Sequence, residues 1–311
     1  MSRNLGYRLP TFVRERDAAS IALDVAEMAA AGGFRTVSCG DHVLWGLPML
    51  DPMPLLAAAA ARIPTVGLGT DVYLPALRHP LHVLRGLATL AQIAGDRVSF
   101  GIGVGGDNPH EFDAVGVDVT QRARRTEAVI DLLRGCQGDV HRVDDVPPPR
   151  NAIPGVGAPP PIFIGGMSSA ARQRAARVGD GWIAMLLSPG RLRSRIAELT
   201  DLRASAGRTH LPFEFVAQLP FRIDHGATAV AAAAQYWREI AGLEFDAIRD
   251  RCALGPAATR DAVEALFAAG ATTVTLMPMT AGRVDELRHV DGACAVAGDV
   301  SGQDESLERT L

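Results

Sequence analysis

A carboxylate, an imidazole and an indole follow one another closely after a short apolar segment. Asp41 and His42 follow residues 34–39 after a single glycine, Gly40, and Trp45 lies three positions beyond His42. A histidine can exchange a proton near neutral pH because its unperturbed pKa is about 6.5. We therefore predict that His42 transfers a proton, that Asp41 orients it or holds a cofactor ring, and that Trp45 walls a flat ligand. A solvated turn with a hydrogen-bonded histidine is the alternative.

A second acid interrupts the apolar segment 65–74. Asp71 lies there between Thr70 and Val72, and burying a carboxylate inside a strand is costly unless a partner compensates it. Asp71 is therefore expected either to face water at a rim or to contact a polar ligand. Arg78 and His79, a few residues later, are read as capping and packing residues of the next helix.

Glycines mark the ends of two further apolar segments. Within segment 97–105, glycine stands at every second position from Gly101 through Gly103 to Gly105, and Gly106 follows. One face of such a strand lacks side chains, so a flat ring could approach its backbone; a tight corner is the alternative.

The other glycine-rich segment, 161–166, leads straight into an expected helix. Gly165 and Gly166 are followed by Met167, Ser168 and Ser169. Backbone N–H groups and the helix dipole at such a position favour an anion, so we predict a phosphate-binding turn here. An ordinary helix cap by one of the serines is the alternative.

Short apolar segments alternate with longer amphipathic ones along the chain, which predicts a parallel sheet covered by helices. Eight strands suffice to close a (β/α)8 TIM barrel, whose active site lies at the carboxyl ends of the strands. The rival, an open doubly wound sheet, should carry a dinucleotide-binding fingerprint after the first strand, and this chain has none. The expected strands are 5–10, 34–39, 65–74, 97–105, 161–166, 181–186, 213–221 and 271–278, and the expected helices are 17–31, 51–62, 80–94, 120–134, 169–178, 190–206, 227–241, 259–269 and 283–290.

The expected organisation is a single domain over residues 1–290. Residues 135–160 are rich in proline, glycine and aspartate and are read as an insertion between strands four and five. Residues 291–311 are polar and acidic and are expected to form a flexible tail.

Composition narrows the range of functions. The net charge is −4 and all 31 basic residues are arginine without a polybasic run, which argues against nucleic acid as a partner. No stretch approaches the roughly 18 apolar residues of a membrane span, and no signal peptide is evident. A cytoplasmic protein without a metal site is expected, because the four cysteines, Cys39, Cys136, Cys252 and Cys294, are widely spaced.

Taken together, these segments resemble the luciferase-like monooxygenase superfamily, and in particular its branch that depends on coenzyme F420, a deazaflavin. The similarity covers residues 5–279 and is carried mainly by VGLGTDVYLPALRHPLHVLRGLATLAQIAGDRVSFGIGVGG and PPIFIGGMSSAARQRAARVGDGWI. The resemblance implies a coenzyme at the barrel mouth, with FMN as the alternative to F420. It also implies a homodimer and a role for the insertion in substrate choice.

The resemblance further implies roles for individual residues. The family's Asp-His pair matches Asp41 and His42, in which the aspartate contacts the coenzyme and the histidine lies beside the reacting groups. Trp45 stands one residue closer to the pair than the family's tryptophan, and Asp107 falls where the family has an acid. A non-prolyl cis peptide is expected at Asp71–Val72. The full expected cofactor-binding set is Asp41, Thr70, Asp71, Val72, Gly103, Gly105, Gly106, Gly165, Gly166, Met167, Ser168 and Ser169, with His42, Trp45 and Asp107 as catalytic residues.

Three functions follow from this reading. The first is hydride transfer between coenzyme F420 and a small organic substrate, with His42 as the proton-transferring group. The second is an FMN-dependent monooxygenase that uses reduced flavin and O2. The third is a barrel that binds a flavin without turnover, which the intact Asp41–His42 pair argues against.

Overall fold

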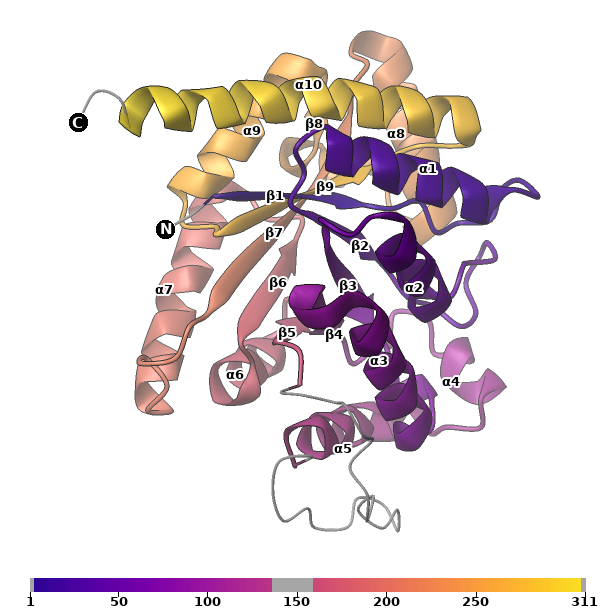
Figure 1. Cartoon of the computed structure of the whole chain (residues 1–311), viewed down its shortest axis with the longest axis vertical. Coiled ribbons are helices and arrows are strands. Elements are labelled where there is room, and N and C mark those ends of the chain that lie inside the picture. Colours follow the sequence, from indigo (N-terminus) through magenta and orange to yellow (C-terminus); the bar gives the residue numbers. More distant parts are fainter. Residues whose placement is uncertain (1–2, 136–158, 309–311) are drawn as a thin grey trace.

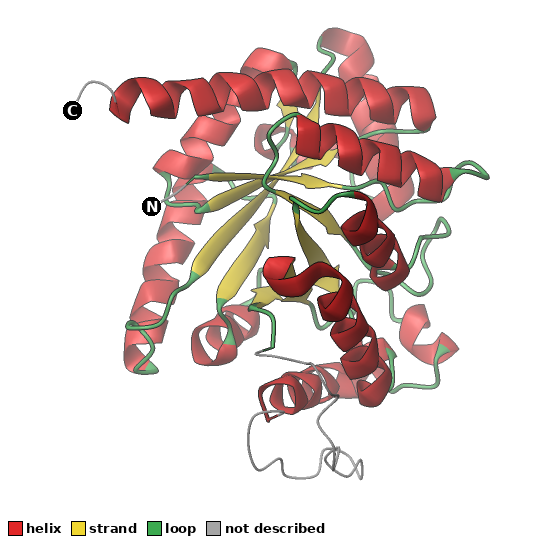
Figure 2. Cartoon of the chain, viewed as in Figure 1, coloured by secondary structure: helices red, strands yellow, loops and turns green. Residues whose placement is uncertain are grey.

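Eight parallel strands close into a barrel with helices around the outside (Figures 1 and 2). The structure, a computed structural model, describes residues 3–135 and 159–308. Strands β1 to β7 follow one another around the barrel, β6 pairs with β7, and β9 lies between β7 and β1. The barrel strands are β1 (Asn4–Arg8), β2 (Thr36–Cys39), β3 (Gly67–Tyr73), β4 (Val98–Ile102), β5 (Ile162–Gly165), β6 (Gly181–Met185), β7 (Glu214–Arg222) and β9 (Thr273–Pro278).

This closed topology confirms the predicted (β/α)8 barrel. An additional two-residue strand, β8 (Ala253–Leu254), pairs only with the end of β7 and was not predicted. The helices are α1 (Ala18–Ala31), α2 (Pro52–Arg62), α3 (Pro80–Ala94), α4 (His110–Ala114), α5 (Arg122–Gly135), α6 (Ser169–Val178), α7 (Pro189–Ser205), α8 (Gly226–Ala241), α9 (Pro256–Ala268) and α10 (Arg283–Glu308). Single-turn 3-10 helices lie at Pro75–Leu77, Gly95–Arg97, Val119–Gln121, Phe245–Ala247 and Arg249–Arg251.

Both faces of the strands are covered, which explains why they read as apolar runs rather than alternating ones. All six residues of β9 are buried. Large side chains fill the space between barrel and helices, among them Tyr7, Phe100, Trp182 and Phe221, each with 0% exposure. A core packed this closely holds the carboxyl ends of the strands in fixed positions.

Helix starts follow clear sequence signals. The bounds of α3 and α6 agree with the prediction, because Pro80 stands at the first position of α3 and Ser168 accepts a hydrogen bond from the Ala171 N–H at the start of α6. The His79 ring also caps α3, by accepting from the Leu81 N–H, so its expected capping role is confirmed.

The prediction for the C-terminal segment was wrong. A short helix ending at 290 and a flexible tail over 291–311 were predicted, but the structure has one helix, α10, over Arg283–Glu308. Residues 309–311 lie outside the described residues. Its buried residues include Val290, Ala293, Ala297 and Val300, which recur at helical spacing. This face packs beside α1 across the outside of the barrel (Figure 1). This buried face consists mainly of small residues, and the acidic residues and glycines between them obscure its helical periodicity in the sequence.

Two further expectations concern the insertion and membrane-spanning segments. Most of the predicted insertion, residues 136–158, lies outside the described residues. None of the helices within 3–135 and 159–308 combines the length and apolar character needed to cross a bilayer.

Candidate active site at the barrel mouth

His42 is held on two sides just beyond the carboxyl end of β2. Its Nδ1 lies 2.6 Å from Oε1 of Glu111, and its ring stacks on the Trp45 indole with centroids 3.9 Å apart and planes inclined by 29°. The histidine side chain is 21% exposed, whereas that of Glu111 is 1% exposed. The contact with Glu111 occupies Nδ1 and leaves Nε2 as the ring nitrogen available for proton exchange.

Glu111 was missed by the sequence analysis, which chose Asp107 as the acid of this segment. Asp107 is exposed, while Glu111 lies on the single-turn helix α4 and points into the protein toward His42. A signal for α4 does exist, because Asn108 accepts a hydrogen bond from the His110 N–H and Pro109 precedes the helix. A five-residue helix is too short to show a periodic pattern.

The loop that carries His42 is also anchored at other points. The Trp45 indole N–H donates to the Ile240 carbonyl of α8 at 2.6 Å, and the Asn108 amide donates to the Leu44 carbonyl at 2.9 Å. Trp45 therefore supports the imidazole ring from one face, whereas the sequence analysis expected it to wall a ligand.

Asp41 is bound by an arginine. Arg78 makes a two-pronged contact with its carboxylate at 2.6 and 2.9 Å, and the Leu74 N–H donates to the same group at 2.9 Å. Burial raises the pKa of Asp41, and the hydrogen bonds from Arg78 and Leu74 oppose that rise. The pair ties the loop after β2 to the loop after β3. Arg78 thus does more than the packing role expected from the sequence.

Asp71 lies inside the barrel rather than at a water-facing rim, so that alternative was wrong. Its Oδ2 accepts hydrogen bonds from Ser38 and Gln218, each at 2.7 Å. Arg8 approaches Oδ1 at 3.6 Å from β1. Burial raises the pKa of Asp71, and the Arg8 charge is the strongest opposing influence. Thr70, also in the expected set, is buried and donates to the Gly101 carbonyl at 2.7 Å.

The peptide bond Asp71–Val72 is cis, as the family resemblance implied. The Val72 side chain lies between two of the predicted glycines: a Cβ at Gly103 would stand 2.5 Å from it, and one at Gly165 would stand 2.4 Å from it. These glycines therefore make room for Val72, a partly exposed residue. The expected bare glycine face is covered by this side chain.

The turn between β5 and α6 is open to solvent, as a phosphate-binding turn requires. Residues 166–169 are exposed, and Gly166 has a φ of +121°. Trp182 of β6 is fully buried and fixes the turn by donating to the Gly166 carbonyl at 2.9 Å. The Ser168 hydroxyl accepts from the Ala171 N–H at 3.1 Å, so the capping interpretation holds for this serine.

A cation missed by the sequence analysis stands near the neighbouring strand end. Gly105 and Gly106 have φ values of +67° and +112°, and a Cβ at Gly106 would lie 2.9 Å from Nε of Arg122. That Nε is buried and has no hydrogen-bond partner among the described residues. Because β4 and β5 are paired, the Gly106 loop and the 166–169 turn emerge at the same edge of the barrel.

The described residues include no cluster of histidine, cysteine, aspartate or glutamate suited to a metal ion. The cysteines within them, Cys39, Cys252 and Cys294, are free thiols. Cys136 lies outside the described residues.

The profile of the luciferase-like monooxygenase family matches residues 4–300. The chain belongs to this family. It is similar to an F420-dependent glucose-6-phosphate dehydrogenase of Beutenbergia cavernae, at 29% identity over 254 residues, which cover 76% of this chain and 73% of the relative. It is also similar to an FMNH2-dependent dimethylsulfone monooxygenase of Pseudomonas fluorescens, at 33% identity over 151 residues, 44% of this chain and 38% of the relative.

Solved structures agree on the fold. An F420-dependent secondary alcohol dehydrogenase in complex with an F420-acetone adduct superposes with a TM-score of 0.77 at 19% identity, over 95% of this chain and 98% of that one. These relatives are oxidoreductases that depend on F420 or on reduced FMN.

Proposed function

We propose that this chain is an oxidoreductase that transfers a hydride between coenzyme F420 and a small organic substrate at the barrel mouth. The observation that carries the proposal is the His42 imidazole, held by Trp45 and Glu111 with Nε2 left for proton exchange. An imidazole fixed in this way is suited to the proton transfer that must accompany hydride transfer to or from a carbon–oxygen or similar bond.

The proton steps are assigned to this chain's own residues. His42 Nε2 accepts a proton when the substrate is oxidised and returns one when it is reduced. Glu111, at 2.6 Å from Nδ1, stabilises the positively charged imidazolium that forms when His42 takes up a proton. In this assignment Glu111 takes the acidic role that the sequence analysis gave to Asp107, and Trp45 is a positioning residue.

The residues around the mouth fit a phosphate-bearing cofactor with a flat ring. The exposed residues of the 166–169 turn, including Met167 and Ser169, lie at the N-terminus of α6, where backbone N–H groups favour an anion. Arg122 offers a guanidinium whose buried Nε has no hydrogen-bond partner among the described residues. Val72 presents a partly exposed apolar surface between the β4 and β5 ends. Coenzyme F420, when bound, supplies a carrier that takes or gives two electrons as a hydride.

Reduced FMN acting with O2 is the competing cofactor, favoured by the monooxygenase relative. A fluorescence titration of the purified protein with F420 and with FMN separates the two. The proposal predicts tight F420 binding and weak FMN binding. Tighter binding of FMN would favour the monooxygenase, and binding of neither would refute both.

A pair of variants links binding to the proposed phosphate contact. Arg122→Met should weaken F420 binding by about ten- to a hundredfold, because a charge-assisted hydrogen bond contributes about 1.5–3 kcal/mol. Arg124→Met, an exposed neighbour on α5, is the matched control and should bind as the wild type does. Equal affinities of the two variants would remove Arg122 from the cofactor site.

A further inference from the structure

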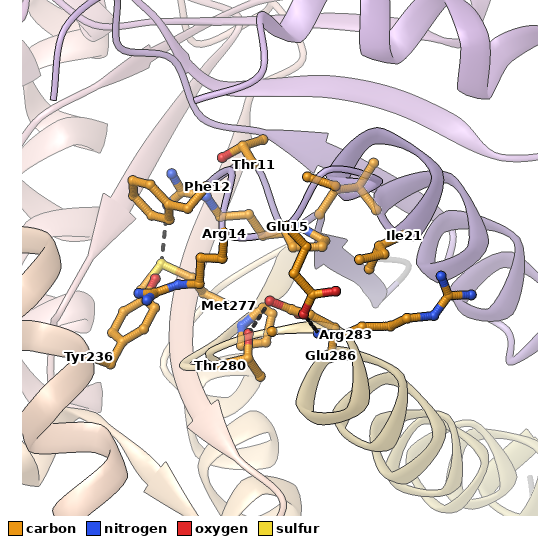
Figure 3. Close-up of a pocket in the computed structure, with 16 residues that line it drawn as sticks. Thr11, Phe12, Arg14, Glu15, Ile21, Tyr236, Met277, Thr280, Arg283 and Glu286 are labelled. Carbon is orange, nitrogen blue, oxygen red and sulfur yellow. Dashed lines mark hydrogen bonds between the residues drawn. The ribbon is translucent and has the colours of Figure 1, made fainter. Parts of the chain in front are cut away.

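A small cavity lined by both apolar and charged side chains lies under the loop that follows β1, beside the site described above. Figure 3 shows it between the β1 loop, α8 and the start of α10. Its volume is about 50 Å³, which is more than one water needs but too little for a cofactor ring. Its polar lining comes mainly from Arg8, Arg14, Glu15, Tyr236, Thr280 and Glu286.

Arg8 reaches this cavity with most of its hydrogen-bonding capacity unused. Its side chain is 19% exposed and makes no hydrogen bond to an oxygen of the residues that the structure describes. NH1 contacts the Met277 sulfur at 3.1 Å, and Nε is 3.6 Å from Asp71. A guanidinium with five donors and no close oxygen acceptor is ready to bind an anionic group.

Other donors converge on the same space. Figure 3 shows Arg14 reaching toward Tyr236 on one side, with Thr280 and Glu286 on the other. Burial raises the pKa of Tyr236 to about 12, while the charges of Arg8 and Arg14 oppose the rise. Both guanidinium groups therefore lie near this hydroxyl, and Tyr236 can donate to a ligand at any pH near neutrality.

Glu286 is the acid of the cavity with an unused oxygen. Oε1 accepts from the Thr280 hydroxyl, and Oε2 is buried with no partner among the described residues. Burial raises the pKa of Glu286 to about 7, with Asp285 adding to the rise and Thr280, Arg14 and Arg222 opposing it. Below that pH the carboxyl is neutral and can donate. Glu15, by contrast, is occupied, since it accepts from the Arg283 N–H at 2.8 Å.

We propose that this cavity binds the carboxylate end of the substrate, so that the substrates are small carboxylic acids. A carboxylate has few enough atoms for the space and would accept hydrogen bonds from Arg8 and Tyr236, beside the charge of Arg14, whose NH2 donates to Glu239 of α8 at 2.9 Å. Arg8 links the cavity to the reacting region, because it lines the cavity and its NH2 lies 2.0 Å from where a Cβ on Gly40 would stand, and Asp41 and His42 follow Gly40 directly. The substrate assignment rests on the proposed function, since it takes the barrel mouth as the place of reaction.

Binding of formate and acetate to the cofactor-free protein tests this assignment, with formamide as the neutral analogue of formate. Calorimetry or ¹³C NMR should detect formate binding to the wild type, stronger below pH 7 than above it, and little binding of formamide. Arg14→Met should weaken formate binding by about tenfold or more. Tyr236→Phe, which removes only a hydroxyl, should weaken it by about fivefold.

The control is Arg16→Met, which removes an exposed arginine two residues along the same loop. It should bind formate as the wild type does. The proposal is overturned if formate does not bind the wild type, if formamide binds equally well, or if all three variants behave alike. None of these outcomes touches cofactor binding, so the F420 titration judges the proposed function separately.

Discussion

Two regions of the barrel mouth differ in how their buried polar groups are partnered. On the side of β2, β3 and α4, Asp41 is paired with Arg78 and His42 with Glu111. On the side of β1, β9 and α10, Arg8 donates to no oxygen of the described residues and comes no closer than 3.6 Å to a carboxylate, that of Asp71. Each region also holds one buried carboxylate oxygen without a hydrogen-bond partner among the described residues, Oε2 of Glu111 in the first and Oε2 of Glu286 in the second. The paired region is arranged before any ligand arrives, as catalytic groups must be, whereas the unpaired region gains its partners from a ligand.

The largest effect should come from removing the base of the paired region. His42→Ala should lower kcat/KM for hydride transfer by about 10²–10⁴, the usual contribution of a positioned acid–base group. The assay follows the absorbance of F420 with panels of alcohols, imines and enones. His110→Ala changes a neighbouring histidine whose side chain is 84% exposed, and it should leave the rate unchanged. Full activity in His42→Ala would end the assignment of proton transfer to this residue.

The second largest effect should come from removing Arg78, which pairs with Asp41 in the paired region. Arg78→Met leaves the buried Asp41 carboxylate without its cation and should lower the free energy of unfolding by about 3–5 kcal/mol. Urea denaturation measures it. Adding Asp41→Asn should restore much of the loss, because the uncompensated charge is then gone. Arg62→Met removes exposed ion pairs on α2 and should change stability little. Loss of the same size in both arginine variants would contradict this account.

A smaller effect comes from the unpaired region and depends on pH. The folded-state pKa of Glu286, about 7, lies above its value in the unfolded chain, so the folded protein binds the proton more tightly. Its stabilising contribution is complete below about pH 4.3 and is lost as pH rises through 7. Glu286→Gln should therefore gain about 2–3 kcal/mol relative to the wild type between pH 5 and pH 8.

Thermal or urea unfolding across this pH range measures the difference. The exposed Glu244→Gln on the loop after α8 is the control and should follow the wild-type profile. Parallel profiles for Glu286→Gln and the wild type would mean that Glu286 is ionised throughout, and the contrast between the two regions would lose its chemical basis.

The sequence alone was sufficient to predict the barrel and the candidate site residues that lie next to a strand end. Asp41, His42 and the 166–169 turn could be found because a parallel barrel places every such residue at one mouth. Glu111 and Arg122 could not be found this way. They lie nine and twenty residues after β4, and only the folded path of the chain brings Glu111 to His42 and Arg122 to Gly106.

Partners within the barrel were harder still to predict. Asp71 was recognised as an unusual buried acid, but Ser38, Gln218 and Arg8 come from three other strands, and no local pattern links them. The role of the strand-four glycines was also misjudged, because the Val72 side chain that fills their space comes from the adjacent strand. Contacts across strands depend on register, which a single sequence does not specify.

The most direct test of this account is a crystal structure of the protein with coenzyme F420. We predict its phosphate between Arg122 and the 166–169 turn, its ring against Val72, and the reacting face of the ring within reach of His42. A complex with the phosphate bound elsewhere, or with the ring out of reach of His42, would contradict the proposed function.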